Sequence, residues 1–537
     1  MKILGISGSL DCPQNHDASA ALVIDGELIA NLEEERLNRL KHSVGEQFPR
    51  LAVQKILKDN NLTLDDIDVI AIPHEARVRD WFAKRVIDII DPNCKKIPEF
   101  YYYDHHMGHV CDSFFQSGFD STVAVIVDGN GDGKDGITIA HCKDNEIKIL
   151  KKYTEGVSLG KMYYSASVAM ADLGEFSEGK FMGLSSYGRP TPVRVLRWEN
   201  GEIIANFTNI VNEDASLNMQ YYLKRNFYPY TLRTADECNI LYYIDMAATI
   251  QENYNEIFME VVKYAKELTN EENLILSGGC IQNCIGNNLV VESGLFKNVF
   301  AGPAPHDAGV AAGHAFSAAL KYGDKIKNVR LKNSYVGQTY SDEEILAACE
   351  KTPDAYDENE LVLALRNSKV VGWFQGGSEI GPRALGHRSI LANPADRDAL
   401  YVINNYVKHR ENWRPLAPIV PAELFDMVFD TPSKDLTEFM LRTLKIRPEW
   451  QRKISAVCHI DMTTRPQCLE KEQNPELYSL LMAFYRATGI PCLINTSFNG
   501  KNEPIIETPE QAIAFLKRTP HMDRVIFNSK WVVHNDL

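Results

Sequence analysis

The stretch that best indicates the fold is residues 122–152, TVAVIVDGNGDGKDGITIAHCKDNEIKILKK. Its first six residues form an apolar run typical of a strand, and a glycine-rich loop follows from Asp128. Ile137–His141 and Ile147–Lys152 then flank the polar residues Lys143–Glu146, which predicts a hairpin. The segment therefore predicts a strand, a glycine-rich loop and a hairpin in succession.

The same arrangement occurs near the start of the chain. Lys2–Ile6 is a short apolar run followed by Ser7-Gly8-Ser9, and Ala20–Ile24 and Glu27–Asn31 flank Asp25-Gly26. Asp-Gly between two apolar runs is a strong hairpin signal. A duplicated unit of this type favours an α/β fold of the actin-like ATPase superfold, in which two ribonuclease-H-like halves enclose a nucleotide.

Two helices are predicted beyond these strands. The first is a polar helix over Leu32–His42, LEEERLNRLKH. The second follows from apolar residues that recur with the helical period, namely Ile250, Tyr254, Ile257, Val261, Ala265 and Leu268. This helix leads into a strand at Leu274–Leu276, then into Ser277-Gly278-Gly279 and a further helical segment. That order allows the backbone to approach a phosphate or an adenosine at a helix N-terminus.

A domain boundary is predicted within Lys321–Ser334, which is rich in lysine and has little apolar periodicity. We place one domain at residues 1–325 and a second at residues 326–537. The second begins with a capping box, Ser341-Asp-Glu-Glu344. It continues with a strand at Val370–Phe374 and later starts another helix at Thr508-Pro509.

Composition and charge narrow the functional classes. The chain has 537 residues, of which 45% are hydrophobic and 24% charged, so it is a globular protein long enough for two or more domains. A formal net charge of −15 counts against nucleic acid as a partner. The eleven scattered cysteines form no CxxC pair, which favours reduced thiols. No signal peptide or run of about 18 apolar residues is visible, so we expect a cytoplasmic protein with no membrane partner.

Residues 101–115, YYYDHHMGHVCDSFF, contain a candidate metal site. In a helix, His105 and His109 would lie on one face, at a spacing that suits two ligands of one ion. Asp128 ends a predicted strand and Asp307 opens a predicted helix, and both could add a carboxylate. Two histidines with two carboxylates suit Fe(II), Mn(II) or Zn(II). The alternative is a pair of unrelated histidines.

Two motifs resemble known ligand sites but fail on a required residue. The loop from Asp128 begins like an EF-hand, yet Ile139 stands where a bidentate glutamate is needed. Residues 174–180, GEFSEGK, match G-x-x-x-x-G-K, but Phe181 replaces the Ser or Thr that would hold magnesium. Calcium binding and a P-loop are therefore excluded.

His16 lies in the loop NHDASAAL, which would face the nucleotide cleft of the superfold. An imidazole there could act as an acid or base, or donate to a developing oxyanion. The alternative is a histidine that only orients the loop.

The second half of the chain carries a series of cations beside glycine- and proline-rich turns. Residues 374–394, FQGGSEIGPRALGHRSILANP, hold Arg383, His387 and Arg388, which suggest an anion site with guanidinium support. Further polar candidates are Lys408, Arg410, Arg414, Arg465, Ser497 and Asn499. Together they predict a small phosphate pocket, although each cation alone is more often solvated or salt-bridged.

Several of these motifs together resemble a known family. They are HDASAAL, HHMGH, EGKFMGLSSYG, SGGCIQNC, GPAPHDAG, GPRALGHRSIL, WRPLAP and NTSFN, and the resemblance extends from His16 to Thr508. In kind and order they are similar to the O-carbamoyltransferases of nodulation-factor and antibiotic biosynthesis. The resemblance implies a duplicated ribonuclease-H-like domain (actin-like ATPase superfold) followed by a YrdC-like α/β domain.

The resemblance also implies a reaction. The YrdC-like domain would form carbamoyl-adenylate from carbamoyl phosphate and ATP, and the first domain would transfer the carbamoyl group to a hydroxyl of a small-molecule acceptor. The implied cofactors are ATP with Mg(II) and a divalent metal, Fe(II) first, with Mn(II) or Zn(II) as alternatives. Nucleic acid and membrane are not implied as partners, and a homodimer is left open.

By motif position, the resemblance assigns roles to individual residues. The metal ligands would be His105, His109, Asp128 and Asp307. The catalytic residues would be His16, Arg383 and Lys408. The residues that bind nucleotide and carbamoyl phosphate would be Lys180, Gly278, Gly279, Asn283, Arg383, Lys408, Arg414, Arg465, Ser497 and Asn499.

Three other functions stay open at this point. They are a threonylcarbamoyl-type transferase acting on tRNA, a sugar or acid kinase of the same superfold, and a non-catalytic scaffold gated by nucleotide. The absence of a basic stripe in the sequence counts against the first.

Overall fold

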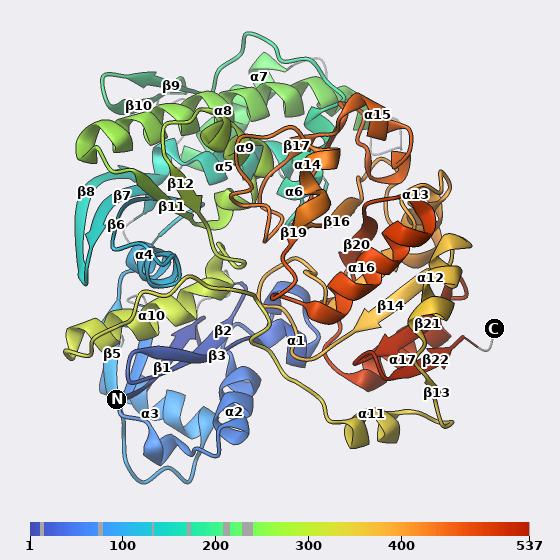
Figure 1. Ribbon diagram of the computed structural model, residues 1–537. Coiled ribbons are helices and arrows are strands. Elements are labelled where there is room, and N and C mark those ends of the chain that lie inside the picture. Colours follow the sequence, from blue (N-terminus) through green and yellow to red (C-terminus); the bar gives the residue numbers. More distant parts are fainter. Residues whose placement is uncertain are drawn as a thin grey trace.

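The computed structural model describes residues 1–535 except 11–15, 74–78, 132–133, 169–172, 208–214 and 228–239. Within this part of the chain, three large sheets carry the architecture (Figure 1). The first two sheets lie one above the other on one side of the molecule, and the third forms the opposite side.

The first sheet has the order β3-β2-β1-β4-β5. Its strands are β1 (Lys2–Ser7), β2 (Ser19–Ile24), β3 (Glu27–Glu33), β4 (Val69–Pro73) and β5 (Glu99–Tyr103). The predicted hairpin is confirmed, because β2 pairs antiparallel with both β1 and β3, while β1, β4 and β5 run parallel. Apolar residues of α2 (Arg50–Asp59) and α3 (Arg79–Ile90) form one core with this sheet, and both helices lie below it in Figure 1.

The second sheet repeats this topology with the order β12-β11-β6-β7-β8. Its strands are β6 (Ser121–Val127), β7 (Asp135–Lys143), β8 (Glu146–Thr154), β11 (Asn273–Ser277) and β12 (Asn298–Phe300). Again the first strand pairs with a hairpin on one side and with parallel strands on the other. The shared order is what the sequence repeat predicts for a duplicated unit.

Helices surround the second sheet and fill the space between the first two. They are α4 (His105–Phe115), α5 (Leu159–Ser167), α6 (Glu178–Ser185), α7 (Ala215–Asn226), α8 (Ile240–Thr269), α9 (Cys284–Glu292) and α10 (Asp307–Lys321). The predicted long amphipathic helix is confirmed as α8. In Figure 1, α4 and α10 lie between the two sheets. A short hairpin of β9 (Leu196–Glu199) and β10 (Glu202–Ala205) lies outside them.

Helices α4 and α10 approach each other more closely than side chains would allow. A Cβ atom added at Gly313 would lie 1.8 Å from the carbonyl oxygen of Gly108. A Cβ added at Gly108 would lie 2.7 Å from Cγ1 of Val310. Glycine at both crossing positions therefore sets the distance between the two helices.

The third sheet is mixed and has the order β13-β22-β21-β14-β15-β20-β16-β19. Its strands are β13 (Asp354–Ala355), β14 (Val370–Phe374), β15 (Arg388–Ala392), β16 (Ala417–Pro421), β19 (Gln467–Leu469), β20 (Leu493–Ser497), β21 (Met522–Phe527) and β22 (Trp531–His534). One face packs on α12 (Glu358–Arg366) and α16 (Pro475–Thr488). The other packs on α11 (Asp342–Ala348) and α17 (Pro509–Lys517).

The remaining α-helices and strands of this region are short. They are α13 (Ala399–Val402), α14 (Phe425–Val428), α15 (Pro448–Gln451), β17 (Leu444–Lys445) and β18 (Thr463–Thr464). The predicted capping box at Ser341 and the helix start at Thr508 are confirmed at the N-termini of α11 and α17.

The chain between α10 and α11 contains no helix or strand, and every strand of the third sheet follows it in sequence. The regions on either side, residues 1–325 and 326–537, are called the first and second parts below. They share packing, because Phe439, Met440 and Leu441 belong to the core of the second sheet. Among the described residues, no helix combines the length and the apolar character needed to cross a membrane.

The prediction of a polar helix over residues 32–42 is wrong in its length. The helix α1 covers only Glu34–Asn38, and Arg39 then adopts a left-handed φ of 63°. Both guanidinium NH2 groups of Arg39 donate to the carbonyl oxygens of Pro504 and Ile505, at 2.9 and 2.7 Å. The helix thus ends just before Arg39, whose side chain bonds a distant segment, a contact that local propensity cannot foresee.

Candidate functional site

Four side chains predicted as metal ligands meet between the first two sheets. The ligand atoms of His105, His109, Asp128 and Asp307 all lie within 4.8 Å of one another. Nε2 of His105 lies 3.2 Å from Nε2 of His109 and 3.2 Å from Asp128. Oδ1 of Asp307 lies 3.5 and 3.6 Å from the same two nitrogens. Four donors therefore converge on one point.

The surrounding elements explain why these residues meet. Asp104 caps α4 by accepting from the N–H of Met107 at 3.1 Å, so the helix starts at His105 and places His109 one turn later. Asp128 directly follows β6, and Asp307 is the first residue of α10. The cluster thus forms where one strand ends and two helices begin.

Neighbouring polar groups orient two of the four side chains. Nδ1 of His109 lies 3.2 Å from the hydroxyl of Ser277, which leaves Nε2 facing the cluster. The N–H of Gly279 donates to Oδ1 of Asp128 at 3.0 Å, while Oδ2 faces His105. Such outer contacts are typical of metal ligands, whose free atoms they hold in place.

The charges of the cluster favour a cation. Burial by itself would lower the pKa of His105, but Asp307 and Asp128 raise it well above its usual value. Burial and Asp307 would raise the pKa of Asp128, but the two imidazoles lower it to about 2. Two anionic carboxylates and two imidazoles fit a divalent ion such as Fe(II), Mn(II) or Zn(II).

The predicted catalytic histidine belongs to a polar network beside this cluster. Nδ1 of His16 lies 2.8 Å from Oδ2 of Asp17, and Nδ1 of His42 lies 2.7 Å from Oδ1 of the same carboxylate. The Phe176 ring stacks on His42 at 4.1 Å and meets His16 edge-on at 5.3 Å. Burial would lower the pKa of His16, yet Asp17 raises it to about 10, with Asp307 and Asp128 adding to the effect.

A second cluster, called the cation pocket below, lies in the second part of the chain. Nζ of Lys408 donates to the carbonyl and hydroxyl oxygens of Ser497, at 2.5 and 3.0 Å, and to the side-chain oxygen of Asn499. Lys408 follows a π-helical turn at Ile403–Val407, an irregularity frequent at functional sites. The lysine is buried, and its pKa is lowered well below the usual value by burial and by Arg410 and Arg414.

Arginines complete the cation pocket. Arg383 lies close to Arg465 and Arg414, and burial together with these charges lowers its pKa to about 9. In the described part of the chain, the Nε atoms of Arg383 and Arg465 have no hydrogen-bond partner. Glu411 pairs with Arg414 at 3.6 Å and with Lys180 at 3.3 Å. Positive charges thus outnumber carboxylates, an arrangement that an anion would stabilise.

Sequence reasoning missed two residues of these sites. Burial lowers the pKa of Lys41, and Arg414, Lys180 and Arg383 lower it further, so Lys41 brings a cation of the first part to the pocket. His42, next in sequence, joins the Asp17 network. Both lie in the segment predicted as a plain polar helix, and no local pattern distinguishes them.

Of the predicted nucleotide-binding residues Gly278, Gly279 and Asn283, Gly279 bonds Asp128 of the four-residue cluster and Gly278 packs against the neighbouring Val127. A Cβ at Gly278 would lie 2.2 Å from the carbonyl oxygen of Val127, so glycine is required by packing there. The side chain of Asn283 caps α9 by accepting from the N–H of Gly286 at 3.0 Å. In this structure, all three residues form hydrogen bonds with other residues of the protein.

Two cations predicted to face an anion do not do so. Arg388 is fully buried, and its guanidinium donates to the carbonyl oxygens of Gln375 at 2.6 Å and Gly376 at 3.1 Å. Nδ1 of His387 lies 2.7 Å from the carbonyl oxygen of Gly377, and its ring stacks on Tyr335 at 3.4 Å. Both residues bond their own loop, whereas Arg383 interacts electrostatically with Arg465 and Arg414.

Two family models and several known proteins match this chain. The family model described as "Carbamoyltransferase N-terminus" matches residues 77–316, and "Carbamoyltransferase C-terminus" matches residues 362–534. Nodulation protein NolNO of Sinorhizobium fredii is 33% identical, with 98% of this chain and 82% of that protein covered.

Two further proteins are also similar to this chain. The 3'-hydroxymethylcephem-O-carbamoyltransferase of Amycolatopsis lactamdurans is 30% identical over 65% of this chain and 63% of its own length. A crystal structure of full-length HypF in the phosphate- and nucleotide-bound form is 12% identical, with a TM-score of 0.37 and 60% and 56% of the two chains covered.

Proposed function

The chain belongs to the carbamoyltransferase family, and we propose that it is an ATP-dependent O-carbamoyltransferase that works through carbamoyl-adenylate. Its substrates are carbamoyl phosphate, ATP and a small molecule with a hydroxyl group. The observation that carries the proposal is the presence, in one chain, of a cation pocket short of carboxylates and a separate four-residue cluster of imidazoles and carboxylates.

The cation pocket, in a YrdC-like second part, serves the first half-reaction. Water first hydrolyses carbamoyl phosphate to carbamate and phosphate. A carbamate oxygen then attacks the α-phosphorus of ATP, and the bond to pyrophosphate breaks as the carbamoyl–AMP bond forms. Arg383, Lys408 and Arg414 neutralise the phosphate charge that develops in this step.

The second half-reaction belongs to the site between the first two sheets. The acceptor oxygen attacks the carbamoyl carbon, AMP leaves, and the hydroxyl proton passes to solvent or to AMP. With a pKa of about 10, His16 is an imidazolium near neutral pH, so it donates a hydrogen bond to the carbonyl oxygen as negative charge develops. Asp17 holds its ring in place.

A divalent ion held by His105, His109, Asp128 and Asp307 would supply Lewis-acid polarisation next to His16. Elemental analysis after purification tests this assignment. We expect the His105→Ala/His109→Ala variant to lose the bound metal. Undiminished metal in that variant would refute the ligand set.

Product analysis tests the reaction. With ATP and carbamoyl phosphate, we expect AMP and pyrophosphate to form. ADP that forms in step with modified acceptor would instead support a kinase and contradict the proposal.

A pair of variants tests the division into two sites. We expect Arg414→Ala to abolish pyrophosphate release from ATP and carbamoyl phosphate but to keep transfer from supplied carbamoyl-adenylate. His16→Ala should show the opposite pattern. Arg452→Ala, which changes an exposed arginine of the second part, is the matched control. If Arg414→Ala and His16→Ala lose the same activity, the two-site scheme fails.

A further inference from the structure

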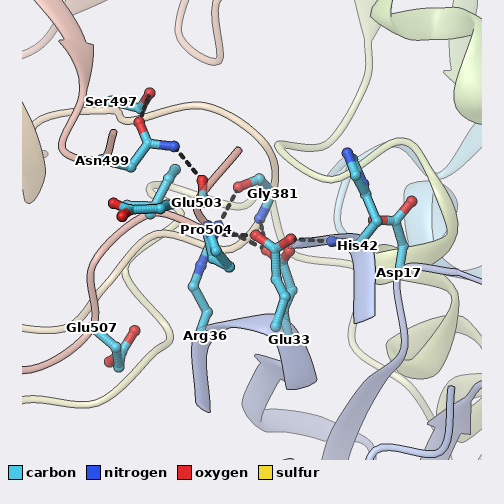
Figure 2. A network of polar contacts seen from close by, with 12 residues as sticks. Asp17, Glu33, Arg36, His42, Gly381, Ser497, Asn499, Glu503, Pro504 and Glu507 are labelled. Atoms are coloured by element: carbon cyan, nitrogen blue, oxygen red, sulfur yellow. Dashed lines mark hydrogen bonds and ion pairs between the residues drawn. The ribbon is translucent and has the colours of Figure 1, made fainter. Parts of the chain in front are cut away.

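The short helix α1 of the first part bonds the loop that carries Arg383. Figure 2 shows Glu33 and Arg36 at the backbone of Gly381. One guanidinium NH2 group of Arg36 donates to the carbonyl oxygen of Gly381 at 2.6 Å, and the N–H of Gly381 donates to Oε1 of Glu33 at 2.6 Å. The same NH2 group lies 3.1 Å from Glu33, and both side chains are buried. Both polar groups of one glycine are thus held by the first part.

Gly381 itself has little freedom. Its φ is +97°, and a Cβ there would lie 2.3 Å from the carbonyl oxygen of Pro303. On the other side of Arg383, one carboxylate oxygen of Glu379 accepts from the N–H groups of Leu385, His387 and Arg388 at 2.8, 2.7 and 3.0 Å. Arg383 therefore projects from a loop that is fixed at both ends.

The second arginine of this segment bonds a second loop of the cation pocket. Arg39 donates to the carbonyl oxygens of Pro504 and Ile505. Just before them, the carbonyl oxygen of Glu503 accepts from Nδ2 of Asn499 at 2.6 Å. Asn499 in turn accepts from Lys408 through its side-chain oxygen. Arg39 is thus connected to Lys408 through this loop, whose residues Asn499, Glu503 and Pro504 are labelled in Figure 2.

Helix α1 is anchored to the first part at its other side. A guanidinium NH2 group of Arg36 donates to Oε1 of Glu35 at 2.6 Å, and Oε2 of Glu35 accepts from the backbone N–H of His42 at 2.6 Å. His42 contacts Asp17, the partner of His16. The contacts of α1 therefore extend from the transfer site to both loops of the cation pocket.

We infer that Glu33, Arg36 and Arg39 are positioning residues for the phosphate-binding pocket, although they belong to the part of the chain that carries out transfer. They hold the two loops so that Arg383 and Lys408 face the same anion. This inference rests on the proposed function in taking the anion to be a phosphate of carbamoyl phosphate, ATP or pyrophosphate. A pocket held in this way binds phosphate only when α1 is docked against it.

Two variants test the inference in the full-length protein. Arg36→Lys keeps the charge, but one ammonium group cannot serve Gly381, Glu33 and Glu35 with guanidinium geometry. Arg39→Met keeps the apolar stem and removes the two bonds to the second loop. The control is Arg330→Ala, which breaks the Arg330–Glu438 ion pair at 2.6 Å and removes the contact of Arg330 with the Phe300 ring of the first part, and touches neither loop.

The readout is binding of inorganic pyrophosphate by calorimetry, together with the melting temperature of each variant. We expect Arg36→Lys and Arg39→Met to weaken pyrophosphate binding roughly 10- to 100-fold, since small displacements of a site cost this much. Arg330→Ala should bind like the unmodified protein even where its melting temperature falls equally. If both variants bind pyrophosphate as strongly as Arg330→Ala does, the inference is overturned. It is also overturned if the unmodified protein does not bind pyrophosphate.

Steady-state kinetics separate positioning from a general loss of structure. We expect both α1 variants to raise KM for carbamoyl phosphate in pyrophosphate release and to keep the unmodified rate of transfer from supplied carbamoyl-adenylate. An equal loss of both activities would contradict a positioning role. If the unmodified protein binds pyrophosphate but releases none from ATP and carbamoyl phosphate, the proposed reaction fails while the binding comparison still decides the inference.

Discussion

At the scale of single residues, Lys408 shows that the cation pocket, which is suited to bind an anion, destabilises the protein when no ligand is bound. Its ammonium group is buried, bonds three oxygen acceptors of Ser497 and Asn499, and lies near Arg410 and Arg414. Burial and these charges lower its pKa well below the ordinary value of about 10.4. The free protein therefore holds this cation at a cost that a bound phosphate would offset.

The sign of the pH effect follows from this lowered pKa. At pH values between the pKa of Lys408 in the folded protein and its pKa in the unfolded chain, the unfolded chain binds more protons than the folded protein. The free energy of unfolding therefore increases as pH rises through this range. We expect the free energy of unfolding of the unmodified protein, relative to Lys408→Met, to increase from pH 7 to pH 10. Urea unfolding without ligand measures this difference. A difference that stays constant across that range would contradict the lowered pKa.

At the scale of elements, the crossing of α4 and α10 sets the geometry of the proposed metal site. Helix α4 carries His105 and His109, and α10 begins with Asp307. Close approach depends on Gly108 and Gly313, because a Cβ at either would overlap the other helix. Residues that face no ligand therefore decide the distances between the ligands.

Gly313→Ala should separate the two helices. We expect lower metal content by elemental analysis and a loss of about 1–3 kcal/mol in the free energy of unfolding, as is usual for overpacking. The matched control is Gly179→Ala in α6, where an added Cβ meets nothing within 4 Å. If Gly313→Ala keeps full metal content and stability, the crossing does not control the site.

At the scale of the whole molecule, the cation pocket depends on both parts of the chain. Lys41 and Lys180 come from the first part, and Arg383, Arg414 and Arg465 come from the second. The net charge is −15, so this local concentration of cations stands out in an acidic protein. An anion bound there should stabilise the arrangement of the two parts.

Pyrophosphate should therefore raise the melting temperature. At a concentration 100 times Kd, a ligand that binds only the folded state adds about 2.7 kcal/mol to stability. We expect this increment for the unmodified protein and for the exposed control Arg452→Ala, and its loss in Arg383→Ala. Thermal unfolding with and without pyrophosphate measures it. An equal increment in Arg383→Ala would show that the ligand binds elsewhere.

The amino-acid sequence by itself determined what depends on neighbours along the chain. The spacing of His105 and His109 predicts a shared helix face, and Asp25-Gly26 and the Ser341 capping box predict a hairpin and a helix start. Their interactions span a few residues, so local patterns carry them. The two repeats of strand and hairpin also predicted the topology that the first two sheets share.

Only the tertiary structure decided which polar residues serve the sites. Arg36 and Gly381 lie 345 residues apart in sequence, and their contact has no local signal. Hydrogen bonds to carbonyl oxygens of their own loop take Arg388 and His387 out of the predicted anion site, and the fold brings Lys41 and His42 to the sites from an ordinary polar segment. The physical reason is that charge and hydrogen bonding act through space, so the role of a polar side chain depends on what the fold places beside it.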